Sequence, residues 1–127
     1  MPIKNTINDE QQIIYSTCIG VMALEDFTDY IGRIWTSPQY FGYNELFDVT
    51  EADWSQFDFG YLLNVAENAA KLSAIDPNSK LAWVILEGKQ TELTDFYKAA
   101  KSMINVPSRQ LQAFYTKDEA LKWLRST

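Results

Sequence analysis

Four carboxylates lie close together in the segment 48–58 and form the group of this chain most suited to chemistry. They are Asp48, Glu51, Asp53 and Asp58. Because Asp48 belongs to a predicted strand, these side chains are expected near the carboxyl end of that strand, where open α/β folds tend to place ligand sites. Carboxylates there could bind Mg²⁺ or Ca²⁺, although the spacing fits no EF-hand loop. The sequence favours a solvated loop, and the alternative is a metal-assisted enzyme that uses Asp48 and Asp53.

The sequence gives little support for two other kinds of acidic site, a response-regulator receiver site and a general acid and base pair. A response-regulator receiver would need an acidic pair after its first strand and a lysine that closes its last strand. Asp9 and Glu10 precede a predicted strand, and Lys117 lies within a predicted helix cap. A general acid and base pair needs one carboxyl group in an apolar pocket that raises its pKa. The one hint of such a pocket is Trp54 beside Asp53.

The chain contains no histidine and a single cysteine. Without histidine, neither a Ser-His-Asp nor a Cys-His arrangement is possible, nor a zinc site with imidazole ligands. Cys18 lacks the neighbours that would lower the pKa of its thiol, and a lone cysteine forms no intrachain disulfide. We interpret Cys18 as a small buried core residue. We predict no catalytic residue, no metal site, no cofactor and no enzymatic activity.

Aromatic residues flank the predicted strand at 45–49 on both sides: Trp35, Tyr40, Phe41, Tyr43, Trp54, Phe57 and Phe59. Such residues are enriched at binding surfaces and also line pockets for apolar or planar ligands. The favoured interpretation is that most of them close the core where helices meet the sheet. Trp54 and Tyr40 are expected to be exposed, because each lies in a polar loop. The candidate partner or ligand surface therefore consists of Trp35, Tyr40, Trp54, Asp48, Asp53 and Asp58.

A third candidate is the turn 87–91, which reads Glu-Gly-Lys-Gln-Thr. Its glycine and the amino terminus of the helix after it could receive an anion. One glycine and one lysine do not make a phosphate-binding loop, so an ordinary turn between a strand and a helix is the favoured interpretation.

Length and composition limit the class of protein. The chain has 127 residues, enough for one core, and we treat 1–127 as a single domain. Its formal net charge of −6, with no basic run, argues against nucleic-acid binding. No apolar segment is long enough to span a bilayer, and the polar start at 1–10 does not resemble a signal peptide. We expect a cytoplasmic protein without membrane insertion.

The unbroken apolar run at 81–86 organises the rest of the chain. Apolar residues without alternation predict a strand that helices cover on both faces, as in parallel sheets. Apolar residues spaced by three and four at 27–35 predict an amphipathic helix, and Thr116 with Glu119 forms a capping box before a terminal helix. Further strands are predicted at 3–7, 13–19, 45–49 and 110–115, with helices at 60–73 and 93–104, and Asp58 is the predicted N-cap of the first of these two helices.

This layout resembles the SpoIIAA-like fold, which is the fold of STAS domains and anti-sigma-factor antagonists. Three stretches carry the resemblance: 46–49 (Leu-Phe-Asp-Val), 81–86, and Phe114-Tyr115 followed by 119–124. It is closest to small bacterial proteins of that fold, most of which are uncharacterised. The resemblance implies an α/β domain with a mixed, mostly parallel sheet of four or five strands and about four helices.

One departure from the family bears on function. Regulatory STAS domains carry an Asp-Ser-Ser-Gly-like loop whose serine is phosphorylated, whereas here Ser55 is the only hydroxyl in the corresponding segment. We therefore expect a non-catalytic STAS-like interaction or regulatory module without the phosphorylation switch, with a protein partner or a second copy as its ligand. The alternative is a binder of small, lipid-like molecules with a pocket lined by Tyr30, Trp35 and Trp54.

Overall fold

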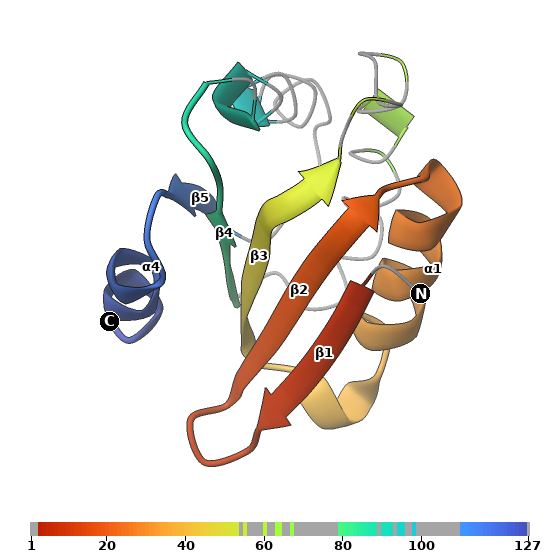
Figure 1. Cartoon of the computed structure of the whole chain (residues 1–127). Coiled ribbons are helices and arrows are strands. Elements are labelled where there is room, and N and C mark those ends of the chain that lie inside the picture. The colour runs from red at the N-terminus through yellow and green to blue at the C-terminus, as the bar shows by residue number, and fades with distance from the viewer. Residues whose placement is uncertain are drawn as a thin grey trace.

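A single five-stranded sheet forms the centre of the computed structural model (Figure 1). The structure describes residues 3–53, 55, 60, 63, 64, 67, 79–88, 90–92, 94, 95, 98 and 110–126. Its strands are β1 (Ile3–Asn8), β2 (Ile13–Val21), β3 (Asn44–Asp53), β4 (Lys80–Val84) and β5 (Gln110–Phe114), and they lie side by side in this order. β1 is antiparallel to β2, and each later pair is parallel. The predicted α/β class with a mixed, mostly parallel sheet is therefore confirmed.

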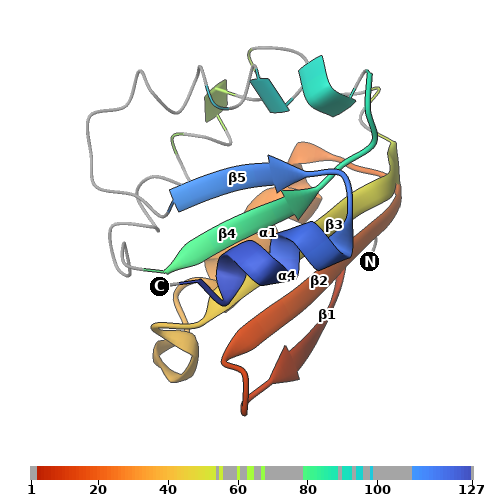
Figure 2. The ribbon, with the colours of Figure 1, turned by 90° about the vertical axis from the view of Figure 1, so that its left-hand side faces the viewer.

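Helices lie on both faces of this sheet. Helix α1 (Leu24–Ile34) covers one face, and α4 (Lys117–Leu124) lies on the other, where it contacts β3, β4 and β5 (Figure 2). A short 3-10 turn, η1 (Pro38–Tyr40), follows α1. The two other predicted helices lie largely outside the described residues, and the described members of 60–67 and 90–98 are helical. The total of about four helices therefore stays a prediction.

The apolar run of β4 lies in the core between these layers. Leu81, Trp83 and Ile85 join the cluster beneath α1, while Ala82 and Val84 join the cluster beneath α4. All five are at most 3 % exposed. The expectation of a strand covered on both faces is confirmed for these residues. It is wrong for Leu86, which is 53 % exposed because β4 ends at Val84 and the chain then turns.

Strand β3 continues through the first part of the segment that the sequence assigned to a loop. Thr50 to Asp53 are strand residues. They pair with the end of β2, with Glu51 opposite Ile19 and Asp53 opposite Val21, after a register shift between Thr17 and Ile19. The loop assignment is wrong here because β2 also continues beyond its predicted end, so the backbone of 51–53 finds hydrogen-bond partners.

The amino terminus of α4 has the predicted N-cap, Thr116, and one of the two bonds that define a capping box. The hydroxyl of Thr116 accepts from the backbone N–H of Glu119 at 3.2 Å and donates to its carboxylate at 3.0 Å. This cap fixes where α4 begins, immediately after β5. Over the described part of the chain, no helix is long and apolar enough to cross a bilayer.

Candidate functional site

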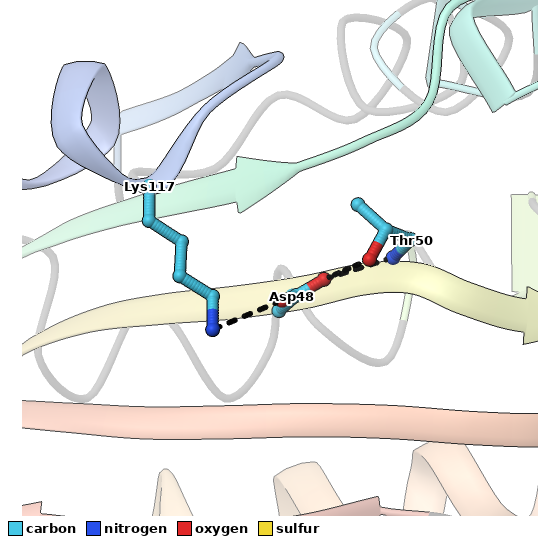
Figure 3. A network of polar contacts seen from close by, with 3 residues as sticks. All are labelled: Asp48, Thr50 and Lys117. Atoms are coloured by element: carbon cyan, nitrogen blue, oxygen red, sulfur yellow. Dashed lines mark hydrogen bonds and ion pairs between the residues drawn. The ribbon is translucent and has the colours of Figure 1, made fainter.

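The side chain of Asp48 in β3 contacts Thr50 of the same strand and Lys117 at the start of α4 (Figure 3). One carboxylate oxygen accepts from the backbone N–H of Thr50 at 2.9 Å and from its hydroxyl at 2.7 Å. The other oxygen lies 3.4 Å from the Nζ atom of Lys117. The sequence placed Lys117 in a helix cap, and it is the first residue of α4, from which its side chain reaches Asp48. Both oxygens of this buried carboxylate are thus bound by the protein.

Among the described residues of the segment, Asp53 does not converge on Asp48. Asp53 is exposed and accepts from the backbone N–H of Ser55 at 2.8 Å. It lies five residues beyond Asp48 on the same strand, which corresponds to roughly 15 Å. Trp54 and Asp58 lie outside the described residues. Within the described ranges, no three Cys, Asp or Glu side chains come together as they would to hold a metal ion.

The geometry predicts unequal effects for the two ends of the Asp48 contact. Asp48→Ala leaves the N–H and hydroxyl of Thr50 without their acceptor and is expected to lower the free energy of unfolding by about 1–3 kcal/mol. Lys117→Ala removes a partner whose side chain is 63 % exposed, and its cost is expected to stay below about 1 kcal/mol. Urea unfolding of both variants measures the difference, and an equal loss would contradict this assignment.

A second carboxylate, Glu45, is fully buried in the core. One of its oxygens accepts from the indole Nε1 of Trp35 at 3.1 Å. The other accepts from the hydroxyl of Tyr30, and the hydroxyl of Ser16 lies within hydrogen-bond distance of both, 3.2 Å from the carboxylate oxygen. The donors come from β2, from α1 and from the residue after α1. A buried carboxylate that accepts from several donors is a paired group, as burial requires.

This network decides where two of the predicted site residues lie. Trp35 is 8 % exposed and Tyr30 is 0 % exposed, so both rings belong to the core between α1 and the sheet. Trp35 is therefore not part of an exposed surface. The lipid pocket expected beside α1 stays a prediction, since Trp54 lies outside the described residues. Tyr40 is half-buried, and its ring packs against that of Tyr43 with centroids 5.7 Å apart.

The single cysteine is confirmed as a core residue. Cys18 is 0 % exposed. Burial, and to a smaller extent the charge of Asp26, raises the pKa of the Cys18 thiol to about 12. The thiol is therefore protonated at neutral pH, and the thiolate that nucleophilic chemistry requires is not formed.

A groove of about 600 Å³ opens beside the carboxyl ends of β4 and β5. Its lining residues are Glu87, Gly88, Thr91, Glu92 and Tyr115. Four of them belong to or follow the turn that the sequence singled out. Tyr115 comes from the end of β5, and the hydroxyls of Tyr115 and Thr91 lie 3.3 Å apart. The contact between Thr91 and Tyr115 could not be predicted from the sequence, because the two residues are 24 positions apart.

Backbone and side-chain contacts fix the turn that forms one wall of the groove. Gly88 has a φ of +97°, a conformation that favours glycine. The side chain of Gln90 accepts from the backbone N–H of Leu86 at 2.7 Å and donates to the carbonyl of Val49 at 2.9 Å. This one amide therefore joins β3 to the segment that follows β4.

Exposed apolar side chains gather at the same edge of the sheet. Ile19 and Val21 are at the end of β2, Leu86 follows β4 and Tyr115 follows β5, and each is at least 50 % exposed. The strands β2, β4 and β5 run in one direction (Figure 1). Residues at or just after their ends therefore lie at one edge of the sheet, the carboxyl edge. Phe41, which is 40 % exposed, precedes β3 and lies at the opposite edge.

A scan against models of protein families finds no match, and a search of curated proteins finds none. Function must therefore be argued from the carboxyl edge and its neighbouring groove.

Proposed function

We propose that this chain is a non-catalytic, STAS-like protein-interaction module of a bacterial cytoplasm, which binds a protein partner or a second copy of itself. The observation that carries the proposal is the set of exposed apolar side chains at the carboxyl edge, Ile19, Val21, Leu86 and Tyr115. Single exposed apolar residues are common, and contiguous exposed apolar patches mark interaction surfaces. The proposal is that these four residues, at one edge of one sheet, belong to such a surface.

The order of the elements supports the STAS-like part of the proposal. An antiparallel hairpin, β1 and β2, opens the sheet, and the later strands add one after another in parallel. A capped terminal helix then packs on the face opposite α1. The mixed, mostly parallel sheet of five strands agrees with the sheet that the resemblance to the SpoIIAA-like fold implies.

The bonding of the polar candidates supports a module without catalysis and without the phosphorylation switch. Asp48 has both oxygens engaged by Thr50 and Lys117, and the thiol of Cys18 is buried and protonated. Ser55 is exposed and follows Asp53, whose carboxylate accepts from its N–H. A phosphate on Ser55 would lie close to this carboxylate, and repulsion between the two opposes the modification.

Loss of apolar surface at the carboxyl edge is the test of this function. Ile19→Thr and Leu86→Ser keep the fold, because both side chains are half exposed, and Ile19→Thr also keeps a β-branched residue in its strand. Phe41→Ser removes a similar exposed side chain from the opposite edge and serves as the matched control. Sedimentation velocity measures self-association, and cross-linking in a lysate followed by binding to the purified partner measures hetero-association.

The expected result is that Ile19→Thr and Leu86→Ser weaken the association at least about tenfold, or about 1.4 kcal/mol, while Phe41→Ser leaves it unchanged. Circular dichroism and urea unfolding establish that the variants are folded. The proposal fails if the wild-type chain shows neither a dimer nor a partner and instead binds a small apolar molecule tightly.

A further inference from the structure

The groove beside the carboxyl ends of β4 and β5 is open to solvent, and its lining combines two glutamates with the ring of Tyr115. Its volume of about 600 Å³ is within the range of roughly 300–1,000 Å³ that ligand sites occupy. Sites for small molecules, however, enclose most of the ligand surface. An open groove is better suited to a chain that lies across it and places one or two side chains inside.

The walls of the groove are formed before any ligand arrives. The 3.3 Å contact between Thr91 and Tyr115 ties the start of the helical segment to the end of β5. The side chain of Gln90 joins Leu86 to Val49. Binding to such a preformed surface does not have to order it first, which lowers the entropic cost of association.

The charge around the groove favours a cationic occupant. Glu87 and Glu92 are exposed at its lining, and the segment 87–95 carries three carboxylates and one lysine, Lys89, a net charge of −2. The nearby cation Lys117 is paired with Asp48. No described lysine or arginine is paired with either glutamate. An anion, the ligand considered for this turn from the sequence, would be repelled by both carboxylates.

Two apolar side chains complement these charges. The ring of Tyr115 is 52 % exposed, and Leu86 beside the turn is 53 % exposed. Lysine and arginine combine an apolar stem with a charged end, and a cation over an aromatic ring gains about 0.5–1 kcal/mol or more. Tyr115 and both glutamates line the groove, and Leu86 immediately precedes the lining residue Glu87.

From this combination we infer that the groove is a docking site for a lysine- or arginine-rich, amphipathic segment of the partner protein. The inference rests on the interaction function proposed above and adds to it the chemical class of the partner. It places the charged residues of that segment at Glu87 and Glu92 and its apolar residues at Leu86 and Tyr115.

Two fluorescein-labelled octapeptides test this site, one alternating lysine with leucine and one alternating glutamate with leucine. Fluorescence anisotropy at low ionic strength measures their binding to the wild-type chain. In the first variant, Glu87→Gln is combined with Glu92→Gln. In the matched control, Glu25→Gln is combined with Asp29→Asn, which removes two exposed charges from α1. Both double variants change the net charge of the chain from −6 to −4.

The lysine peptide is expected to bind at least about tenfold more tightly than the glutamate peptide. The groove variant should weaken its binding at least about fivefold and the control less than about twofold, and Tyr115→Ala should also weaken it. High salt should reduce the difference between groove variant and wild type, since exposed charges are screened.

Three results would each overturn the inference: no binding of either peptide, equal binding of both peptides, or equal weakening in the groove variant and the control. The last result would mean that the lysine peptide responds to net charge alone. None of these results contradicts the proposed interaction function. That proposal is contradicted if Ile19→Thr and Leu86→Ser leave every association of the wild-type chain unchanged.

Discussion

Replacing Glu45 by alanine is expected to lower the free energy of unfolding by about 3 kcal/mol or more. The change removes the acceptor that Trp35, Tyr30 and Ser16 share in a buried site. Each buried donor that loses its acceptor costs about 1–3 kcal/mol, although Tyr30 and Ser16 still contact each other. The truncated side chain also leaves a cavity, which adds to the loss. The variant no longer has to desolvate a carboxyl group, which is a stabilising change. The expected net loss in the free energy of unfolding is therefore near the lower end of the sum of these costs.

Two milder variants separate the parts of this effect. Glu45→Gln keeps the shape and one acceptor, and its expected cost is about 1–2 kcal/mol. Tyr30→Phe removes one donor from the network and leaves the carboxylate bound to Trp35 and Ser16, at an expected cost of about 1–2 kcal/mol. Urea unfolding, followed by tryptophan fluorescence, gives all three values. If Glu45→Ala unfolds within about 0.5 kcal/mol of the wild type, the network contributes little to stability.

The parts of the fold that the sequence predicted are those with a local signal. The helical spacing at 27–35 requires only neighbouring residues to be recognised, and α1 covers Leu24–Ile34. The capping-box pattern at Thr116 and Glu119 spans four residues and marks the start of α4. The run Leu81–Ile85 indicated burial on both faces because it lacks polar residues. Each of these features depends on a single element.

The parts that the sequence did not show depend on residues far apart in the chain. Asp48 and Lys117 are 69 positions apart, and their contact requires α4 to lie over β3. The extension of β3 to Asp53 follows from the length of its neighbour β2, and propensity carries no information on that length. Sequence spacing alone does not place these pairs, because it does not give the order of the strands.

The candidate site shows the same division. The sequence singled out the turn after β4, but it did not show that Tyr115 completes a groove there. It also grouped Trp35 with surface residues, since an aromatic residue near a loop has no local mark of burial. A signal was present in Glu45, which alternates with Phe47 and Val49 and therefore shares their buried face. A carboxylate on the buried face of a strand indicates a hydrogen-bond network in the core. Tyr30 and Trp35 supply donors to this network.

Trp83→Ala and Leu86→Ala, two changes within one apolar run, are expected to have very different effects on stability. Trp83 is 3 % exposed in β4, and its ring lies 6.5 Å from that of Phe47 between centroids. Its replacement should lower the free energy of unfolding by about 3–5 kcal/mol, the usual cost of removing a large core side chain. Leu86 is 53 % exposed, so Leu86→Ala should change that free energy by less than about 0.5 kcal/mol.

Urea unfolding of the two variants, followed by circular dichroism because one of them loses a tryptophan, measures this contrast. Val84→Ala extends it to the opposite face of the sheet, where Val84 packs with Ala120 and Leu124 of α4. An observed cost of about 1–3 kcal/mol would establish that packing on both faces of β4 contributes to stability. A loss from Leu86→Ala as large as that from Trp83→Ala would mean that Leu86 is buried. The carboxyl edge would then lose one of its four exposed apolar side chains, and the partner surface built on them would lose the residue that links it to the groove.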